Sequence, residues 1–279
     1  MIPYSTQTIE YDDLEAVRDV LTSPFLTCGP KITEFEDKVC TYTGANFAVG
    51  VNSCTSALHL AMIALGVSKG DRVFVSAISF VASSNCARYQ GADVDFIDVD
   101  KFTGNLDVDS LEQMLIDADK EHRLPKVVVA VHLSGRAVDL ERIAKLKAKY
   151  GFYLVEDAAH AFGAIYHDTM IGSCKFSDIT VLSFHPVKII TTAEGGMCLT
   201  NNENLYKLMR KFSTHGIEHN LDALENKDMP AYYYEMQDLG FNYRLSDLQA
   251  ALGISQLAKV DELLRKRREI AHDYQEILG

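Results

Sequence analysis

FYLVEDAAHAFGA, residues 152–164, sets the architecture expected of this chain. Its first half is a short apolar run that ends in Glu156 and Asp157, and small residues follow. Such a run predicts a parallel strand buried on both faces of a sheet. Ligands of open α/β sheets bind at the carboxyl ends of the strands, so an acid at this point is placed to face a ligand. An acid at a strand end is also typical of a helix cap or a surface turn, and the segment alone leaves that alternative open.

Apolar runs of the same kind recur from about residue 47 onward, and amphipathic helices such as 139–149 separate several of them. The expected strands are 47–52, 72–77, 94–98, 126–133, 152–156, 179–184 and 196–200. Strands that alternate with helices indicate an α/β fold with a mostly parallel central sheet and helices on both faces.

Lys188 stands in SFHPVKIITTAEGG (183–196), among small, hydroxyl and glycine residues. A lysine amine attacks a carbonyl only when it is neutral, and a partly buried loop favours the neutral form. The small neighbours leave room for a flat ring and offer hydroxyl groups to its phosphate. We therefore expect Lys188 to form a Schiff base with the aldehyde of a cofactor. A lysine that extends from a loop into solvent is the alternative.

Two other segments support a cofactor of this kind. An acid such as Asp157 can keep a pyridine nitrogen protonated, which makes pyridoxal phosphate (PLP) an electron sink. In VNSCTSALHLAMIALG (51–66), a strand leads through hydroxyl residues into an apolar helix, whose N-terminus can bind a phosphate. An ordinary N-cap explains those hydroxyl residues equally well. Phe80, after the next strand, could stack on a pyridine face, although core packing is the usual role of a phenylalanine.

Composition indicates a cytoplasmic enzyme. The 279 residues are 47% hydrophobic, enough for one large α/β domain. The six cysteines are scattered without a C-x-x-C pair, so we expect reduced thiols and no metal site. The opening IPYSTQTIEYDD does not resemble a signal peptide, and no run approaches the length that spans a membrane. A net charge of −12 argues against nucleic acid as a partner.

The last third of the chain departs from the alternating pattern. The tract 215–238 is polar and then rich in tyrosine, which fits a mobile loop over the site, a dimer contact or an ordinary surface loop. From Ser246, which is a good N-cap, one long amphipathic helix is expected to run to the end of the chain, and its apolar stripe implies a partner surface.

Five motifs in order, NSCTSALHL, SFVAS, LVEDAAHAFGA, SFHPVKIITTAEGG and LGFNYRLSDLQAALG (239–253), resemble the DegT/DnrJ/EryC1/StrS family of sugar aminotransferases. The match covers nearly the whole chain, and the ordered set is much more specific than any one motif. The resemblance implies the type I fold of PLP-dependent aminotransferases. The opening IPYSTQ and the run AISFVAS are similar to those members that transaminate a UDP-linked 4-keto sugar on the way to pseudaminic acid.

The resemblance implies a role for each matching residue around the ring of PLP. Lys188 would form the Schiff base and then move the proton, Asp157 would pair with the pyridine nitrogen, and Phe80 would stack on the ring. His160 stands where glutamine is common in the family. It would lie near the ring hydroxyl, to which either side chain can donate a hydrogen bond.

The phosphate and the substrate complete the implied site. The residues that would hold the phosphate are Cys54, Thr55 and Ser183; many relatives have glycine or alanine at the first position, so the backbone N–H of Cys54 is the expected contact. Asn242 would reach the phosphate of the neighbouring subunit. The implied sugar-nucleotide contacts are Tyr4, Phe25, Leu26 and Thr27, although both segments also fit an N-terminal tail and an ordinary loop.

We therefore expect a homodimer with shared active sites that moves an amino group from glutamate to a nucleotide-linked 4-keto-6-deoxy sugar. The alternatives are another nucleotide-sugar aminotransferase of the family and a truncated PLP-binding protein without turnover. Dehydratase relatives replace the lysine with histidine, so Lys188 argues against that activity.

The domain organisation also follows from the resemblance. Residues 1–245 would form the large PLP-binding α/β domain, and 246–279 would be a long connecting helix. Family members continue past this helix into a smaller domain that helps to close the site. The resemblance thus implies that the small C-terminal domain is largely absent and that this chain is truncated.

Overall fold

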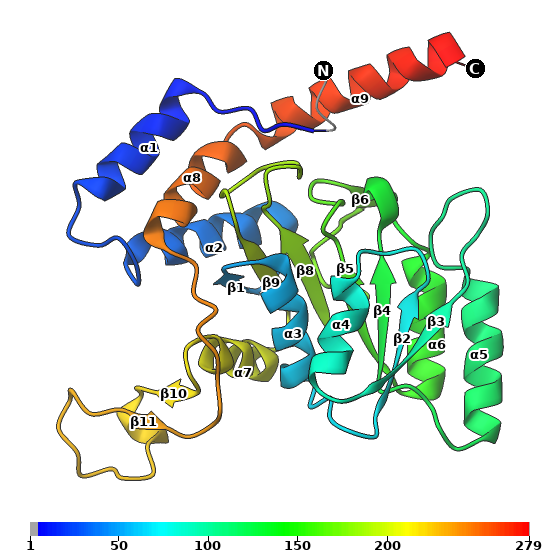
Figure 1. Ribbon diagram of the computed structural model, residues 1–279, viewed down its shortest axis with the longest axis horizontal. Coiled ribbons are helices and arrows are strands. Elements are labelled where there is room, and N and C mark those ends of the chain that lie inside the picture. Colours follow the sequence, from blue (N-terminus) through cyan, green and yellow to red (C-terminus); the bar gives the residue numbers. More distant parts are fainter. Residues whose placement is uncertain (1–4, 279) are drawn as a thin grey trace.

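A seven-stranded sheet runs through the centre of the computed structural model, which describes residues 5–278 (Figure 1). Its strands are β1 (Phe47–Val51), β2 (Arg72–Ser76), β3 (Asp93–Ile97), β4 (Val127–Val131), β5 (Tyr153–Asp157), β8 (Ile179–Ser183) and β9 (Gly196–Thr200). They lie in the order β1-β9-β8-β5-β4-β2-β3. The strand β9 runs antiparallel to both β1 and β8, and the other neighbouring pairs are parallel. The seven predicted strands and the mostly parallel sheet are confirmed.

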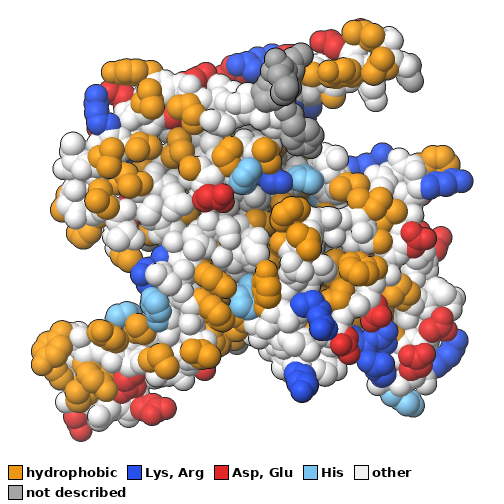
Figure 2. Space-filling model, in the orientation of Figure 1, with side chains coloured by type: hydrophobic (Ala, Val, Ile, Leu, Met, Phe, Trp, Pro, Cys, Tyr) orange, Lys and Arg blue, Asp and Glu red, His pale blue; other side chains and the backbone are white. Residues whose placement is uncertain are grey.

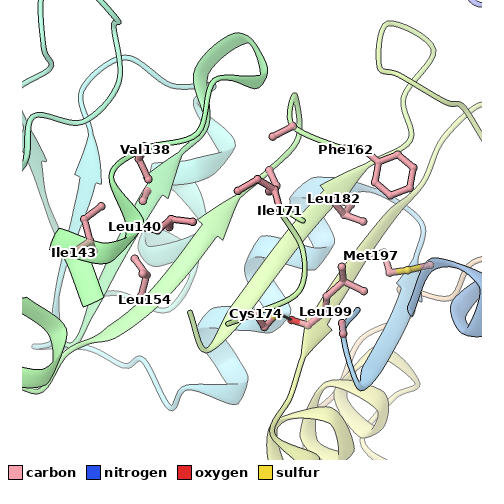
Figure 3. Packing of buried hydrophobic residues seen from close by; sticks show 14 of the residues in the cluster. Val138, Leu140, Ile143, Leu154, Phe162, Ile171, Cys174, Leu182, Met197 and Leu199 are labelled. Carbon is pink, nitrogen blue, oxygen red and sulfur yellow. Dashed lines mark hydrogen bonds between the residues drawn. The ribbon is translucent and has the colours of Figure 1, made fainter. Parts of the chain in front are cut away.

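Helices cover both faces of the sheet, because its central strands are apolar on both sides; β4 and β8 are buried at every residue. One face packs against α3 (Cys54–Ala64), α4 (Ala82–Tyr89) and α7 (Glu203–Ser213). The other packs against α2 (Pro30–Thr43), α5 (Val108–Lys120) and α6 (Leu140–Tyr150). Figure 3 shows part of this second core, where Leu140 and Ile143 lie near Leu154 of β5.

Short elements connect these layers. They are the hairpin of β6 (Ile165–Tyr166) and β7 (Thr169–Met170), the ribbon of β10 (Ile217–Glu218) and β11 (Glu235–Met236), and the turns η1 (Leu133–Gly135) and η2 (Leu221–Ala223). The ribbon, within the predicted irregular tract 215–238, extends away from the sheet (Figure 1). Tyr232 and Tyr234 there are 84% and 55% exposed. Its suggested role as a dimer contact stays a prediction.

The C-terminal segment forms two helices, so the prediction of a single helix over 246–279 is wrong. Ser246 caps α8 (Asp247–Leu257) as expected, and the chain then turns before α9 (Val260–Leu278). At this turn Lys259 Nζ lies 2.8 Å from Asp12 and from Asp13, at the start of α1 (Tyr11–Leu21), while Val260 is buried. These tertiary contacts favour a break that no glycine or proline marks.

The division of the chain at residue 245 stays a prediction. α8 packs against α1 and α2, and it contributes Ala250 and Leu257 to the core of the large sheet. From there α9 extends along the upper edge of the molecule and beyond it (Figure 1). Among the described residues, no helix combines the length and the apolar character that crossing a bilayer requires.

Candidate active site

A cleft of about 660 Å³ opens at the carboxyl ends of β4, β5 and β8, beside the N-terminus of α3. In Figure 2, acidic, basic and histidine side chains lie close together near the centre of the visible face, below α9. The cleft brings together seven residues predicted to bind the cofactor: Cys54, Thr55, Phe80, Asp157, His160, Ser183 and Lys188. Segments more than a hundred residues apart in the sequence therefore meet in one site.

Lys188 lies in the loop that joins β8 to β9, and its side chain is partly buried. The loop is held by hydrogen bonds to Phe184 O from Thr191 Oγ1 (3.0 Å) and from the backbone N–H of Thr192 (2.9 Å). Desolvation of the amine lowers the pKa of Lys188, and the nearby Cys54 and Asp157 oppose that shift. The site thus favours the neutral amine that attack on a carbonyl requires.

Asp157 ends β5 and is only 4% exposed. Its Oδ2 accepts a hydrogen bond from Ser83 Oγ at 2.6 Å, and its Oδ1 accepts one from Ala159 N at 3.1 Å. These two donors fix the orientation of the carboxylate, which lines the cleft. Ser83, on α4, was not identified from the sequence, although it belongs to the same SFVASS segment as Phe80.

Glu156, the neighbour of Asp157, points to the opposite face of the sheet. It lies 2.8 Å from His132 Nε2 and accepts hydrogen bonds from Ser177 and Thr180, and these four residues are buried. Because successive side chains of a strand alternate between its two faces, only one of the two acids can face the cleft. The structure assigns that position to Asp157.

The N-terminus of α3 lines the cleft. Ser53 Oγ caps the helix by accepting a hydrogen bond from Ser56 N at 3.1 Å. The first-turn N–H groups of Cys54 and Thr55 have no intrahelical acceptor and are available to a phosphate. Burial raises the pKa of the Cys54 thiol well above its ordinary value, so the side chain stays neutral. Gly196 permits this turn to pack on β9, because a Cβ there would lie 2.5 Å from Cys54 N.

His160 and Phe80 both line the cleft. His160 Nδ1 accepts a hydrogen bond from Ser134 N at 3.3 Å, which leaves Nε2 as the protonated nitrogen of a neutral ring. Ser134 takes a left-handed backbone conformation (φ 54°) to present this N–H. Desolvation and the charge of Lys188 lower the pKa of His160, which favours the neutral donor form. Phe80 is 71% exposed at the cleft, so its ring face is accessible to a ligand.

The other predicted residues that the structure describes do not line the cleft of their own chain. Asn242 is exposed, and its backbone O accepts a long hydrogen bond from Asn52 Nδ2 (3.5 Å). Phe25 and Leu26 are 52% and 48% exposed, and Thr27 pairs with Ser246. Tyr4 lies outside the described residues. The role of Asn242 in a neighbouring subunit and the substrate role of the other four stay predictions.

The residues that line the cleft but were not identified from the sequence include Ser134, Glu194 and Arg267. Glu194 stands in the same segment, 183–196, as Lys188. Arg267 belongs to the basic run RKRR of α9, which is typical of a solvent-exposed helix face. No signal in the sequence separates it from its neighbours.

Comparisons with known proteins agree with the resemblance read from the motifs. The model of the DegT/DnrJ/EryC1/StrS aminotransferase family matches residues 7–279. The chain is 41% identical over 274 residues to the UDP-4-amino-4,6-dideoxy-N-acetyl-beta-L-altrosamine transaminase of Campylobacter jejuni serotype O:2, covering 98% of this chain and 69% of that protein. It is 37% identical to the Bacillus subtilis spore coat polysaccharide biosynthesis protein SpsC, with 98% and 68% covered.

Solved structures give the same picture. PseC of Helicobacter pylori, an aminotransferase of pseudaminic acid biosynthesis, is similar with a TM-score of 0.89 and 33% identity, over 99% of this chain and 70% of that one. The PLP form of the Streptococcus pneumoniae protein Spr1654, a putative sugar aminotransferase, has a TM-score of 0.86 and 29% identity, over 99% and 71%. The predicted aminotransferase fold is thereby confirmed.

Proposed function

The chain belongs to the DegT/DnrJ/EryC1/StrS aminotransferase family, and from this premise we propose that it uses PLP to transfer an amino group from glutamate to a UDP-linked 4-keto-6-deoxy sugar. The observation that carries the proposal is the meeting of Lys188, Asp157 and the N-terminus of α3 in one cleft. The sugar is assigned from the altrosamine transaminase and from PseC, which are the similar proteins named above.

The side chains of the cleft fit PLP at each of its functional groups. The free N–H groups at Cys54 and Thr55, with the hydroxyl of Ser183, suit a phosphate. Asp157 suits the pyridine nitrogen, because its carboxylate is buried, oriented by two donors and open to the cleft. Lys188 is a partly desolvated amine that would hold the aldehyde. When bound, PLP supplies an electron sink and a carrier for the amino group.

Each of these residues has a defined task in transamination. Lys188 would hold the aldehyde of PLP, and its amine would move a proton at the donor α-carbon. Asp157 would keep the ring nitrogen protonated, because a buried carboxylate stabilises an adjacent cation. The Nε2–H of His160 would be a hydrogen-bond donor for the ring hydroxyl, and Phe80 would cover one face of the ring.

We place the reaction in the cytoplasm and in a two-fold dimer that shares its active sites. Asn242 is exposed and does not line its own cleft, which suits a contact with a second subunit. Phe25, Leu26 and Thr27 lie at the N-terminal end of α8, close to the FNYR segment that carries Asn242. They would then meet the sugar nucleotide together with Tyr4.

The experiment follows the two half-reactions separately. Purified protein loaded with PLP should convert glutamate to 2-oxoglutarate, with loss of the absorbance of the aldehyde form of the cofactor. It should then aminate a UDP-linked 4-keto-6-deoxy sugar to a product identified by mass. Lys188→Ala is the control and should show neither step, nor a borohydride-reducible bond to PLP. If the unmodified protein forms no 2-oxoglutarate, aminotransfer from glutamate is refuted. The alternative of a PLP-binding protein without turnover then stands.

A further inference from the structure

Arg267 reaches the cleft from α9, a helix that carries none of the residues discussed above for PLP. Its Nη2 donates a hydrogen bond to the backbone O of Lys188 at 3.1 Å. Arg267 also lines the cleft together with His185 and Glu194. The guanidinium thus lies beside the loop that carries Lys188, the residue at which the amino donor is proposed to react.

The base of α9 is anchored, so this placement of Arg267 is determined by packing. Leu263 and Leu264, which precede Arg267 by one turn, pack against the core of the large sheet. Gly163 makes room for this contact, because a Cβ there would lie 2.3 Å from Leu264 Cδ1. Residues three and four apart share one face of a helix, so Arg267 extends from the face that docks on the sheet domain.

Arg267 is the permanent cation of this site. Among the described residues that line the cleft, Lys188 and Arg267 are the only lysine or arginine. Lys188 is committed to the cofactor, and Asp157 and Glu194 both bring negative charge. The chain as a whole carries a net charge of −12. An anionic substrate therefore needs a local positive partner, and within this chain Arg267 is available.

We propose that Arg267 is a specificity-determining residue that binds the distal carboxylate of a dicarboxylic amino donor. This inference rests on the proposed function, because it assumes that an amino acid reacts at Lys188. The guanidinium has five N–H donors arranged to match a carboxylate, and the bond to Lys188 O occupies one of them. Its exposed side chain leaves the others accessible to a ligand.

The same contact explains how the enzyme would distinguish glutamate from glutamine. The two amino acids have nearly the same shape, and they differ in the charge of the distal group. A charge-assisted bidentate pair with arginine is available only to the carboxylate. We expect Arg267→Gln to lower the preference for glutamate over glutamine in the first half-reaction by about 10-fold to 100-fold, the range expected for one charged hydrogen-bonded pair.

Equilibrium binding tests the inference without turnover. Calorimetric titration of the PLP-loaded protein with glutarate and with its monoamide, glutaramate, compares a dicarboxylate with a monocarboxylate of the same shape. Arg267→Gln should weaken glutarate binding by about 10-fold or more and leave glutaramate within about twofold. Arg268→Gln, a change of the adjacent arginine outside the cleft, is the matched control and should bind both ligands as the unmodified protein does.

Three other outcomes would overturn the assignment. An equal loss of glutarate and glutaramate binding would mean that Arg267 binds the carboxylate that both ligands share or positions the Lys188 loop. UDP is titrated in parallel, and a loss of affinity confined to UDP would mean that Arg267 binds the diphosphate of the sugar nucleotide. Unchanged binding of all three ligands, with thermal unfolding confirming the fold, would remove Arg267 from recognition. Failure of the proposed function is separate, because it appears as absence of 2-oxoglutarate in the unmodified protein.

Discussion

Replacing Asp157 by asparagine should leave PLP bound and slow transamination by a factor of about 100 or more. The aspartate is 4% exposed and accepts hydrogen bonds from Ser83 Oγ and Ala159 N. An asparagine of the same shape can keep its oxygen on Ala159 N and direct its amide to Ser83, whose hydroxyl can turn to accept. We therefore expect the fold to survive, but the site would lose the negative charge proposed to keep the ring nitrogen protonated.

A 100-fold loss of rate corresponds to about 2.7 kcal/mol of transition-state stabilisation. Removal of a buried, oriented charge partner is sufficient for an effect of this size, whereas the phosphate contacts at α3 are unaffected. Ser83→Ala provides the graded control. It keeps the charge of Asp157 and removes one charge-assisted hydrogen bond, so we expect a smaller loss of about 10-fold.

The assay measures the rate of 2-oxoglutarate formation from glutamate in single turnover, after PLP occupancy has been determined for each variant. Thermal unfolding of each variant shows whether the fold is retained. Near-normal turnover of Asp157→Asn at full PLP occupancy would refute the assignment of Asp157 to the ring nitrogen. Loss of PLP binding itself would mean that Asp157 is needed for affinity and not only for chemistry.

Three further predictions concern other parts of the site. Lys188→Met should raise the Tm of the PLP-free protein at pH 7, because burial lowers the pKa of Lys188 and the unfolded chain therefore binds the proton more readily. The difference in Tm between the variant and the unmodified protein should shrink as the pH rises toward 10.5, the ordinary pKa of lysine. A difference in Tm that does not depend on pH would contradict this reasoning. Gly196→Ala should weaken PLP binding by about 10-fold or more in a fluorescence titration, because its Cβ would lie 2.5 Å from Cys54 N and displace the phosphate-binding turn; unchanged affinity would show that the turn adapts. Lys188→Ala and Asn242→Arg should each be inactive alone, and mixed dimers formed by co-refolding should recover activity from one intact site; no recovery despite proven subunit exchange would mean that each site is built within one chain.

The sheet was predictable from the sequence because its strands are short apolar runs separated by amphipathic helices. The same logic located Asp157 and the Lys188 loop, because residues that follow parallel strands meet at one edge of the sheet. The order of the motifs then indicated PLP as the cofactor. These signals are local, and each can be recognised within about ten residues of sequence.

The contacts that refine the site could not be predicted, because they depend on packing between distant segments. The turn at Lys259 has no glycine or proline, and carboxylates at the opposite end of the chain stabilise it. Ser134 becomes relevant only when its strained backbone brings its N–H to His160. Arg267 is one of several arginines in α9, and only the packing of that helix selects it.

The adjacent acids of β5 also limit how the gene can tolerate insertions and deletions. One extra or missing residue within this strand would exchange the two faces, bringing Glu156 into the cleft and Asp157 against His132. Neither acid would suit its new position. Glu156 is one methylene longer than the aspartate that lines the cleft, and Asp157 is one methylene shorter than the glutamate that contacts His132. Length changes in the loop between β6 and β7 carry no such penalty, since that hairpin lies outside the large sheet. Libraries that vary chain length should therefore recover active variants with changes at the hairpin and none within β5.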